Sequence, residues 1–309
     1  MNNQWVDWTL RGLTALVFSQ LLGCNKGSAS DAPVASATPP VATSAIAATP
    51  PPAPAAPAAA ASASAAPQGL TYNVFGVAAN DVLNVRAEPS SASKKVYSFG
   101  PEVRGIVGTG QTLEKDKTPW MEVKFQDKTG WINRLFVTEH RAGNGCDDPA
   151  LTAVIRAFMR GVAGKDATAL QALVSPIRGL SLRQSRWNPT VHVALVDVPS
   201  LFTSPTPRKW GKEDSRDEEI VEPFKQHMLE TLHLAVAGKG AQERCGKLIM
   251  GSSAGTNEWP PEYGGLTHVS FHHPGPELEP NHWVTWVLGM EYVDQKPYVA
   301  ALIQYQWGA

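Results

Sequence analysis

The chain has 309 residues, which is long enough for two globular domains of ordinary size. Its formal net charge is −1 at pH 7, so the composition gives no indication of a nucleic-acid partner. Only 18 % of the residues are charged, partly because one long segment carries almost no charged side chains.

Residues 1–23 have the pattern of a secretory signal. An apolar run at residues 13–22 follows Arg11 and is too short to cross a bilayer stably, which takes about 20 apolar residues. The run ends in Leu-Leu-Gly-Cys at residues 21–24, which resembles the lipobox of bacterial lipoproteins. The resemblance implies cleavage before Cys24 and lipidation of this cysteine, so that the protein is anchored to a membrane. Asn25 follows the cysteine, which implies the periplasmic side of the outer membrane in a Gram-negative cell.

Residues 24–69 predict a disordered tether. They are mostly Ala, Pro, Ser and Thr, they include no aromatic residue, and Lys26 and Asp31 carry their only charges. Such a segment buries too little apolar surface to offset the entropy lost on ordering. Three prolines at residues 50–52 favour polyproline II locally. We therefore expect a partly stiff connection between the membrane and the folded part of the chain.

Residues 70–140 contain three strand signals. The run Leu-Asn-Val-Arg-Ala-Glu-Pro-Ser at residues 83–90 predicts a strand that leads into a turn. Residues 120–124, Trp-Met-Glu-Val-Lys, place alternate side chains on two faces. A polar turn at residues 126–130 then leads to Gly-Trp-Ile-Asn, which starts at residue 130. Together these signals predict a small, half-buried antiparallel sheet.

These three motifs, in this order, resemble those of the bacterial SH3 (SH3b) domain. The resemblance covers about residues 70–140 and implies an SH3-like all-β barrel that acts as a binding module, often for cell-wall peptides or glycan. It does not imply catalysis. We expect Val85, Val123 and Ile132 in the core, and we expect Arg86 to tie the barrel together rather than contact a ligand. The binding face varies within this family, so the resemblance assigns no ligand-binding residue.

Residues 146–309 predict an α+β domain that begins with helices. Asp148 and Pro149 are typical of an N-cap and a first helical position, and apolar residues then recur at helical spacing. Asp166 can cap a second helix, which stops before Pro176. A strand-like run at residues 192–196 and a polar stretch at residues 208–219 follow. Pro223 then opens a third helix.

The last part of the chain predicts antiparallel strands. Residues 268–271, 283–288 and 297–307 are rich in β-branched and aromatic residues, and a hairpin turn is expected at residues 295–297. Helices followed by antiparallel strands indicate helices packed on one face of a sheet. This order resembles the NTF2-like and cystatin-like folds. Two segments, residues 208–211 and 304–307, are similar to uncharacterised secreted bacterial domains. Neither likeness implies an activity.

The two cysteines after the lipobox support two hypotheses that exclude each other. In an exported protein, Cys146 and Cys245 most simply form one disulfide. Alternatively, Cys245 is a nucleophile with His268 as its base. SH3b modules often accompany cell-wall amidases and endopeptidases of the NlpC/P60 kind, whose cysteine and histidine segments these residues faintly resemble. The sequence departs from that pattern at Arg244, where the family has Asp.

Two further sets of residues have side chains that are common in functional sites. The first is a group of histidines and glutamates whose spacing does not match a zinc site, so we expect no metal and no cofactor. Its members are His268, His272, His273, His282, Glu277 and Glu279. The second is a group of aromatic residues that either fill a sheet core or line a groove for sugar or peptide. Its members are Trp259, Tyr263, Trp283, Trp286, Tyr298, Tyr305 and Trp307.

The sequence thus predicts a multidomain, lipid-anchored protein of the cell envelope. A disordered Ala/Pro-rich linker carries a small SH3-like barrel, which is followed by an α+β domain. We expect a non-catalytic protein that binds peptidoglycan or an envelope protein through the SH3b module. The alternatives are a cell-wall hydrolase of the Cys/His amidase or endopeptidase type and a protein–protein scaffold in the envelope.

Overall fold

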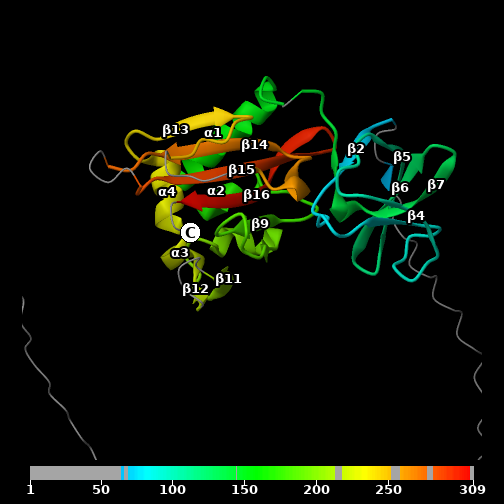
Figure 1. The fold of residues 1–309 in the computed structure, drawn as a ribbon, viewed down its shortest axis with the longest axis horizontal. Coiled ribbons are helices and arrows are strands. Elements are labelled where there is room, and N and C mark those ends of the chain that lie inside the picture. Colours follow the sequence, from blue (N-terminus) through cyan, green and yellow to red (C-terminus); the bar gives the residue numbers. More distant parts are fainter. Residues whose placement is uncertain are drawn as a thin grey trace, which may run out of the picture. The chain divides into compact units, whose positions relative to one another are not determined.

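A computed structural model describes residues 64–65, 69–143, 145–212, 218–251, 258–276 and 281–306. The predicted signal, Cys24 and nearly all of the tether lie outside these residues. The described residues belong to one compact unit, Pro57–Ala309, and are mostly β-sheet with a few helices (Figure 1). None of the helices described is long and apolar enough to span a membrane.

Eight strands of the described residues form the first sheet, in the order β4-β3-β7-β6-β5-β2-β8, with β1 paired to β5. All neighbouring strands are antiparallel. A 3-10 helix, η1 (Arg134–Phe136), links the last two strands. The strands are β1 Ser64–Ala65, β2 Thr71–Val74, β3 Leu83–Arg86, β4 Lys95–Phe99, β5 Ile106–Lys115, β6 Thr118–Phe125, β7 Lys128–Asn133 and β8 Val137–Glu139.

The first sheet follows the sequence pattern closely. Val85, Val123 and Ile132 lie in one buried apolar cluster, as predicted. Arg86 donates a hydrogen bond from Nη1 to the carbonyl oxygen of Ser93 at 2.9 Å, which ties β3 to the turn that follows it. The turn between β6 and β7 is tighter than predicted, because Lys128 of β7 already pairs with Phe125 of β6.

Six strands form the second sheet, in the order β10-β9-β16-β15-β14-β13. Neighbouring strands are antiparallel except β9 and β16, which are parallel. The strands are β9 Leu180–Arg183, β10 Val191–Val193, β13 Gln242–Cys245, β14 Thr267–His273, β15 Val284–Val293 and β16 Lys296–Gln306. The helices are α1 Pro149–Ala163, α2 Ala167–Gln171, α3 Phe224–His227 and α4 Leu229–Ala237, with the 3-10 helices η2 Leu195–Ser200 and η3 Pro261–Tyr263.

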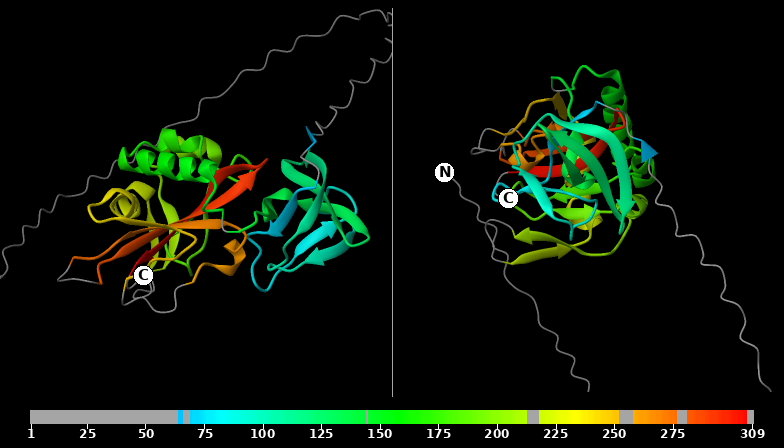
Figure 2. Two further views of the ribbon diagram at one scale, coloured as in Figure 1. Left: turned by 90° about the horizontal axis from the view of Figure 1, so that it is seen from above. Right: turned by 90° about the vertical axis from the view of Figure 1, so that its right-hand side faces the viewer.

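Helix α1 lies along one face of the second sheet (Figure 2). Its first turn is capped as predicted: Asp148 accepts a hydrogen bond from the backbone N–H of Ala150 at 2.8 Å, and Pro149 follows as the first helical residue. Asp166 caps α2 in the same way. The opposite face of the sheet is covered by a second apolar cluster, which includes Tyr263 and Trp283. Both faces of this sheet are therefore buried.

Four segments differ from their predictions. Helix α2 ends at Gln171, because Val174 instead forms a β-bridge with Val299. The strand predicted at residues 192–196 shortens to β10, and η2 follows it. The third helix is interrupted at Met228, between α3 and α4.

The polar stretch at residues 208–219 also departs from the sequence pattern. It contributes the strands β11 (Arg208–Lys212) and β12 (Glu219–Glu222), which pair with each other. Trp210 is fully buried between them and the helices, and its indole N–H donates to the carbonyl oxygen of Glu222 at 2.8 Å. One buried indole therefore fixes a segment whose other side chains are mostly polar.

Buried charges fasten the first sheet to the second. The guanidinium of Arg178 binds the Glu291 carboxylate at 2.7 Å and also donates to the backbone carbonyls of Leu135 and Val137 in the first sheet. The side chains of this ion pair are 6 % and 0 % exposed. We call this arrangement of Arg178 and Glu291 the arginine clamp.

Glu139 makes the reciprocal connection from the first sheet to the second. Its two carboxylate oxygens accept hydrogen bonds from the backbone N–H groups of Asp294 and Gln295, at 2.7 and 3.0 Å. These two residues form the tight turn between β15 and β16 and have positive φ angles of 48° and 65°. The tip of this hairpin is thus held by a carboxylate of the first sheet.

Candidate functional site: a groove at the junction of the two sheets

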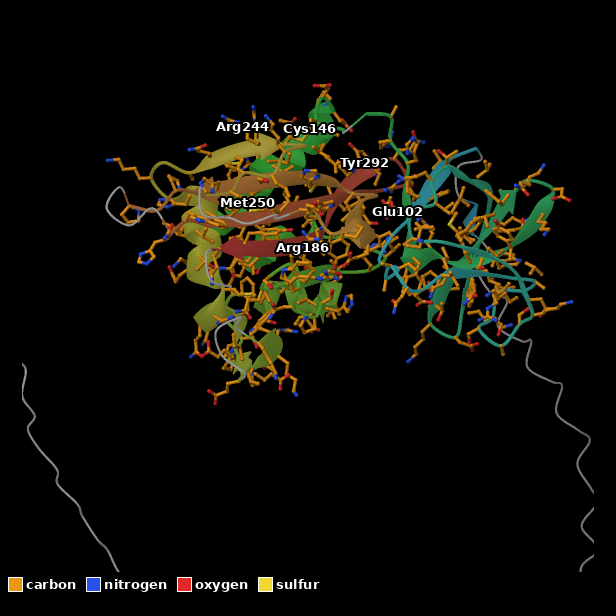
Figure 3. The ribbon with its side chains drawn as sticks, in the orientation of Figure 1. Glu102, Cys146, Arg186, Arg244, Met250 and Tyr292 are labelled. Carbon is orange, nitrogen blue, oxygen red and sulfur yellow. A yellow bond between two sulfur atoms is a disulfide. The ribbon has the colours of Figure 1, made fainter. Side chains whose placement is uncertain are left out.

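The cysteine–histidine pair does not form a catalytic site. Cys146 and Cys245 are joined in a disulfide, which staples the start of α1 to β13 (Figure 3). Cys245 pairs with Val269 across the sheet and so points to the helix-covered face. His268 precedes Val269 on β14, so its side chain points to the opposite face of the sheet. It stacks on Trp259, with ring centroids 5.2 Å apart. The candidate nucleophile is therefore bonded, and the candidate base lies on the other side of the sheet.

The histidine and aromatic sets have mostly structural positions. His268 and His272 share a face of β14, and burial lowers the pKa of both rings below the ordinary histidine value. Among the described residues, no group of three metal-ligating side chains comes together. Four members of the aromatic set are buried: Tyr263, Trp283, Trp286 and Tyr305. Glu277, Glu279 and Trp307 lie outside the described residues.

A cavity of about 280 Å³ opens on the first sheet. Trp120 lies at its base and is 6 % exposed, while Asn84 and Arg86 of β3 form one wall. Asn133 accepts a hydrogen bond from the backbone N–H of Leu135 at 2.9 Å and so caps η1. This cap places Phe136 at the rim of the cavity, with 38 % of its surface exposed.

A second, larger cavity of about 710 Å³ adjoins the first. Gly76 and Phe136 line both, so the two cavities are neighbours. Most other residues of the larger cavity lie between Pro176 and Asp197, and Tyr263 also lines it, stacked on Phe75 with 5.3 Å between ring centroids. We call these two adjoining cavities the junction groove.

Charged and polar groups are concentrated in the larger cavity. The guanidinium of Arg183 lies over the Tyr263 ring at 4.7 Å and forms an ion pair with Glu262 at 2.8 Å. Ser181 and His192 lie opposite each other on β9 and β10, with 3.3 Å between the hydroxyl oxygen and Nδ1. Burial, and secondarily the nearby arginines, lower the pKa of His192, so its ring is neutral at pH 7 and acts as a hydrogen-bonding group.

Ser181 and His192 form a hydrogen-bonded pair among the residues that line the larger cavity. Ser181 is only 4 % exposed, and among the described residues its hydroxyl is the only hydrogen-bond partner of the His192 side chain. Aromatic and apolar walls with a few convergent polar groups are the usual composition of a ligand site.

Sequence reasoning missed this groove. Phe136 lies four residues after Ile132 of the Gly-Trp-Ile motif, and Asn133, which caps η1, is the local signal that could have placed it at a rim. Arg183 and His192 belong to no sequence motif. They line the groove because β9 pairs with β10 and β16. Comparison of the chain with models of protein families, with curated proteins and with solved structures found no match.

Proposed function

We propose that the protein is a non-catalytic binding protein of the bacterial cell envelope, that the first sheet is an SH3-like barrel, and that the junction groove holds a peptidoglycan chain. The lipobox-like segment at residues 21–24 supports a lipid anchor on Cys24 and a place at the periplasmic side of the outer membrane. The SH3b-like motifs support a wall-binding role. The single observation that carries the proposal is that Gly76 and Phe136 line both cavities.

An extended ligand explains this geometry. Two neighbouring cavities that share lining residues offer successive contacts to the units of a polymer. The ring of Phe136, 38 % exposed, supplies apolar contact area along the groove. Asn84 and Arg183 supply hydrogen-bonding groups in the groove.

Phe136 is the residue best suited to a test. A phenylalanine side chain buries about 200 Å², so covering the 38 % that is still exposed removes about 75 Å² from water, worth about 1.9 kcal/mol or roughly twentyfold in affinity. The full-length protein in mild detergent is mixed with purified peptidoglycan sacculi and sedimented. We expect the unaltered protein to pellet, and Phe136→Ala to bind roughly twentyfold more weakly.

Val107→Ala is the matched control. Val107 is 41 % exposed, lies on the same sheet and lines neither cavity. Thermal unfolding of both variants checks that each is folded. If the unaltered protein stays in solution, the wall-binding proposal is wrong and the scaffold hypothesis takes its place. If Phe136→Ala pellets like Val107→Ala, the groove is not the binding site.

A further inference from the structure

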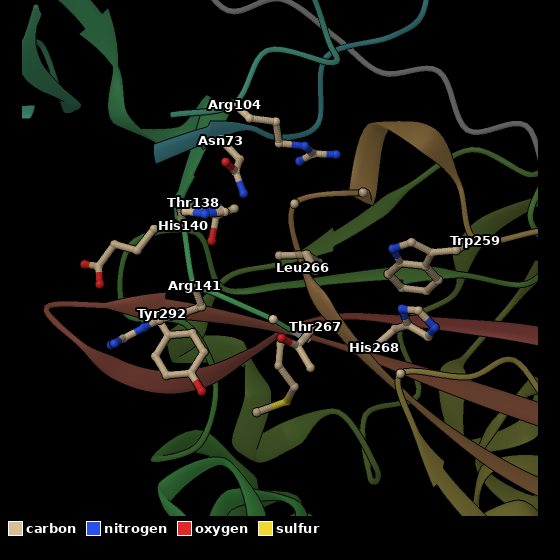
Figure 4. Close-up of a pocket in the computed structure, with 16 residues that line it drawn as sticks. Asn73, Arg104, Thr138, His140, Arg141, Trp259, Leu266, Thr267, His268 and Tyr292 are labelled. Atoms are coloured by element: carbon tan, nitrogen blue, oxygen red, sulfur yellow. The ribbon is translucent and has the colours of Figure 1, made fainter. Parts of the chain in front are cut away.

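Residues of both sheets line a separate polar cavity of about 330 Å³, and none of its residues lines the junction groove. Asn73 of β2, Arg104, and Thr138 and Arg141 at the end of the first sheet form part of its wall (Figure 4). Trp259, residues 264–268 and the β15 residues Met290 and Tyr292 form another part. We call this space the polar cavity.

Three buried polar atoms of this cavity lack hydrogen-bond partners among the described residues. They are Oδ1 of Asn73, Oγ1 of Thr138 and Nε of Arg141. Asn73 is 6 % exposed and Thr138 is 0 % exposed. Buried polar groups in proteins are almost always hydrogen-bonded, and leaving one unpaired is costly. Three such atoms among the residues that line one cavity indicate that their partners come from molecules in the cavity, water or ligand.

Two guanidinium groups give the polar cavity a positive charge. Neither Arg104 nor Arg141 forms an ion pair with a carboxylate among the described residues. Arg141 instead lies over the ring of Tyr292, with its guanidinium carbon 4.2 Å from the ring centroid. Tyr292 donates its phenol proton to Asp148 at 2.7 Å, and burial, followed by this hydrogen bond, raises the pKa of the phenol, so it remains neutral.

Glu139, the one acidic residue in the wall, does not cancel this charge. Both of its carboxylate oxygens are occupied by the amides of Asp294 and Gln295, and the guanidinium of Arg134 lies 3.8 Å away. Its negative charge is therefore compensated from outside the cavity. An anionic group is the ligand that the remaining charges attract.

The unpaired atoms narrow the class of anion. Nε of Arg141 is a donor and needs an acceptor, whereas Oδ1 of Asn73 is an acceptor and needs an N–H or O–H donor. A fully deprotonated carboxylate or phosphate alone offers no donor. Leu266 and Met290, 6 % and 1 % exposed, add a small apolar wall. The volume is at the lower end of the range for ligand sites, which suits one or two residues of a peptide.

We propose that the polar cavity binds an N-acylated amino-acid carboxylate, the chemistry of the C-terminal residue of a peptide. The carboxylate lies beside Arg104, the amide N–H turns to Asn73, and a small side chain contacts Leu266. Two glycines let the walls approach closely enough. A Cβ atom on Gly264 would lie 2.8 Å from a guanidinium nitrogen of Arg104, and one on Gly265 would lie 2.8 Å from a methyl carbon of Thr138.

The test is isothermal titration calorimetry of the full-length protein in mild detergent with four probes. The probes are N-acetylalanylalanine, its C-terminal amide, N-acetylalanine and inorganic phosphate. We expect the dipeptide acid to bind and the amide to bind at least about tenfold more weakly, because the amide loses the charge-assisted hydrogen bonds. If N-acetylalanine binds as tightly as the dipeptide acid, the natural ligand is a free acylated amino acid. If N-acetylalanine binds more weakly, the natural ligand is the C-terminus of a peptide.

Arg104→Ala removes one guanidinium, and because Arg104 is exposed the substitution leaves the fold intact. We expect it to weaken the dipeptide acid at least about tenfold, the effect of a lost charge-assisted contact. Arg156→Ala is the control, since Arg156 is also exposed but lies on α1 outside the polar cavity. The proposal is overturned if no probe binds at millimolar concentration, if phosphate binds as tightly as the dipeptide acid, or if acid and amide bind equally. Sacculus binding through Phe136 tests the proposed function separately.

Discussion

The arginine clamp predicts a large loss of stability when its guanidinium is removed. Arg178→Met leaves the Glu291 carboxylate, which is 0 % exposed, without its partner, and it removes the hydrogen bonds to the carbonyls of Leu135 and Val137. Breaking a buried ion pair from one side costs about 3–5 kcal/mol. For a folded unit of this size each kcal/mol lowers Tm by roughly 2–4 °C, so we expect a fall of roughly 6–20 °C.

Urea unfolding, followed by tryptophan fluorescence, and calorimetry measure this effect. The matched control is Lys165→Met, because the Lys165–Glu230 pair has the same 2.7 Å separation but side chains that are 44 % and 72 % exposed. We expect no measurable change there, since exposed pairs contribute little. The double variant Arg178→Met/Glu291→Leu is expected to regain most of the lost stability, because no unpaired carboxylate is then buried. If Arg178→Met is as mild as Lys165→Met, burial of the pair does not stabilise the junction and our reasoning is wrong.

Three further predictions concern the same unit. Reducing the disulfide, which closes a sequence separation of 99 residues, lowers the free energy of unfolding by up to about 4.7 kcal/mol in urea titrations; an unchanged midpoint contradicts this. Asp148→Ala costs about 1–2 kcal/mol through the lost cap. The hydrogen bond from Tyr292 and the hydrogen bond of the cap lower the pKa of Asp148 in the folded protein. The stability that Asp148 contributes is therefore fully present above pH 3.8 and is lost as the pH falls through the lower folded-state pKa. Acid titration of the unaltered protein and of Asp148→Ala measures this loss. Gly265→Ala places a Cβ 2.8 Å from Thr138 and costs about 1–3 kcal/mol, whereas Gly100→Ala, with open space around it, changes Tm little.

The parts of the fold that the sequence predicts are those set by local chemistry. Asp148 and Asp166 each precede a helix and bond its free N–H groups, so their positions fix two helix starts. Alternation along residues 120–124 identifies the core face of β6, because neighbouring side chains on a strand point to opposite sides. The mostly β-sheet, partly helical character of the chain follows from such signals.

The junction and its cavities depend on pairings far apart in the sequence. Parallel pairing of β9 with β16 brings Ser181 beside Ala301, and no short-range pattern specifies that register. Trp210 lies in a charged segment, where the neighbouring side chains indicate an exposed loop. Burial of its indole and the hydrogen bond to Glu222 instead hold this segment in place. The wall residues Asn73 and Thr138 are ordinary strand residues until the second sheet covers them. The sequence therefore could not predict either cavity.

The reciprocal charges at the junction bear on how such a protein can evolve. The first sheet supplies Glu139 to the β15–β16 hairpin, and the second part of the chain supplies Arg178 to the carbonyls around η1. A gene segment for either half, transferred alone to a new protein, would carry an unmatched charge or unmatched carbonyls on an apolar surface. Natural selection therefore favours inheritance of the two halves as a pair, and recombination in the connection between β8 and α1 is disfavoured.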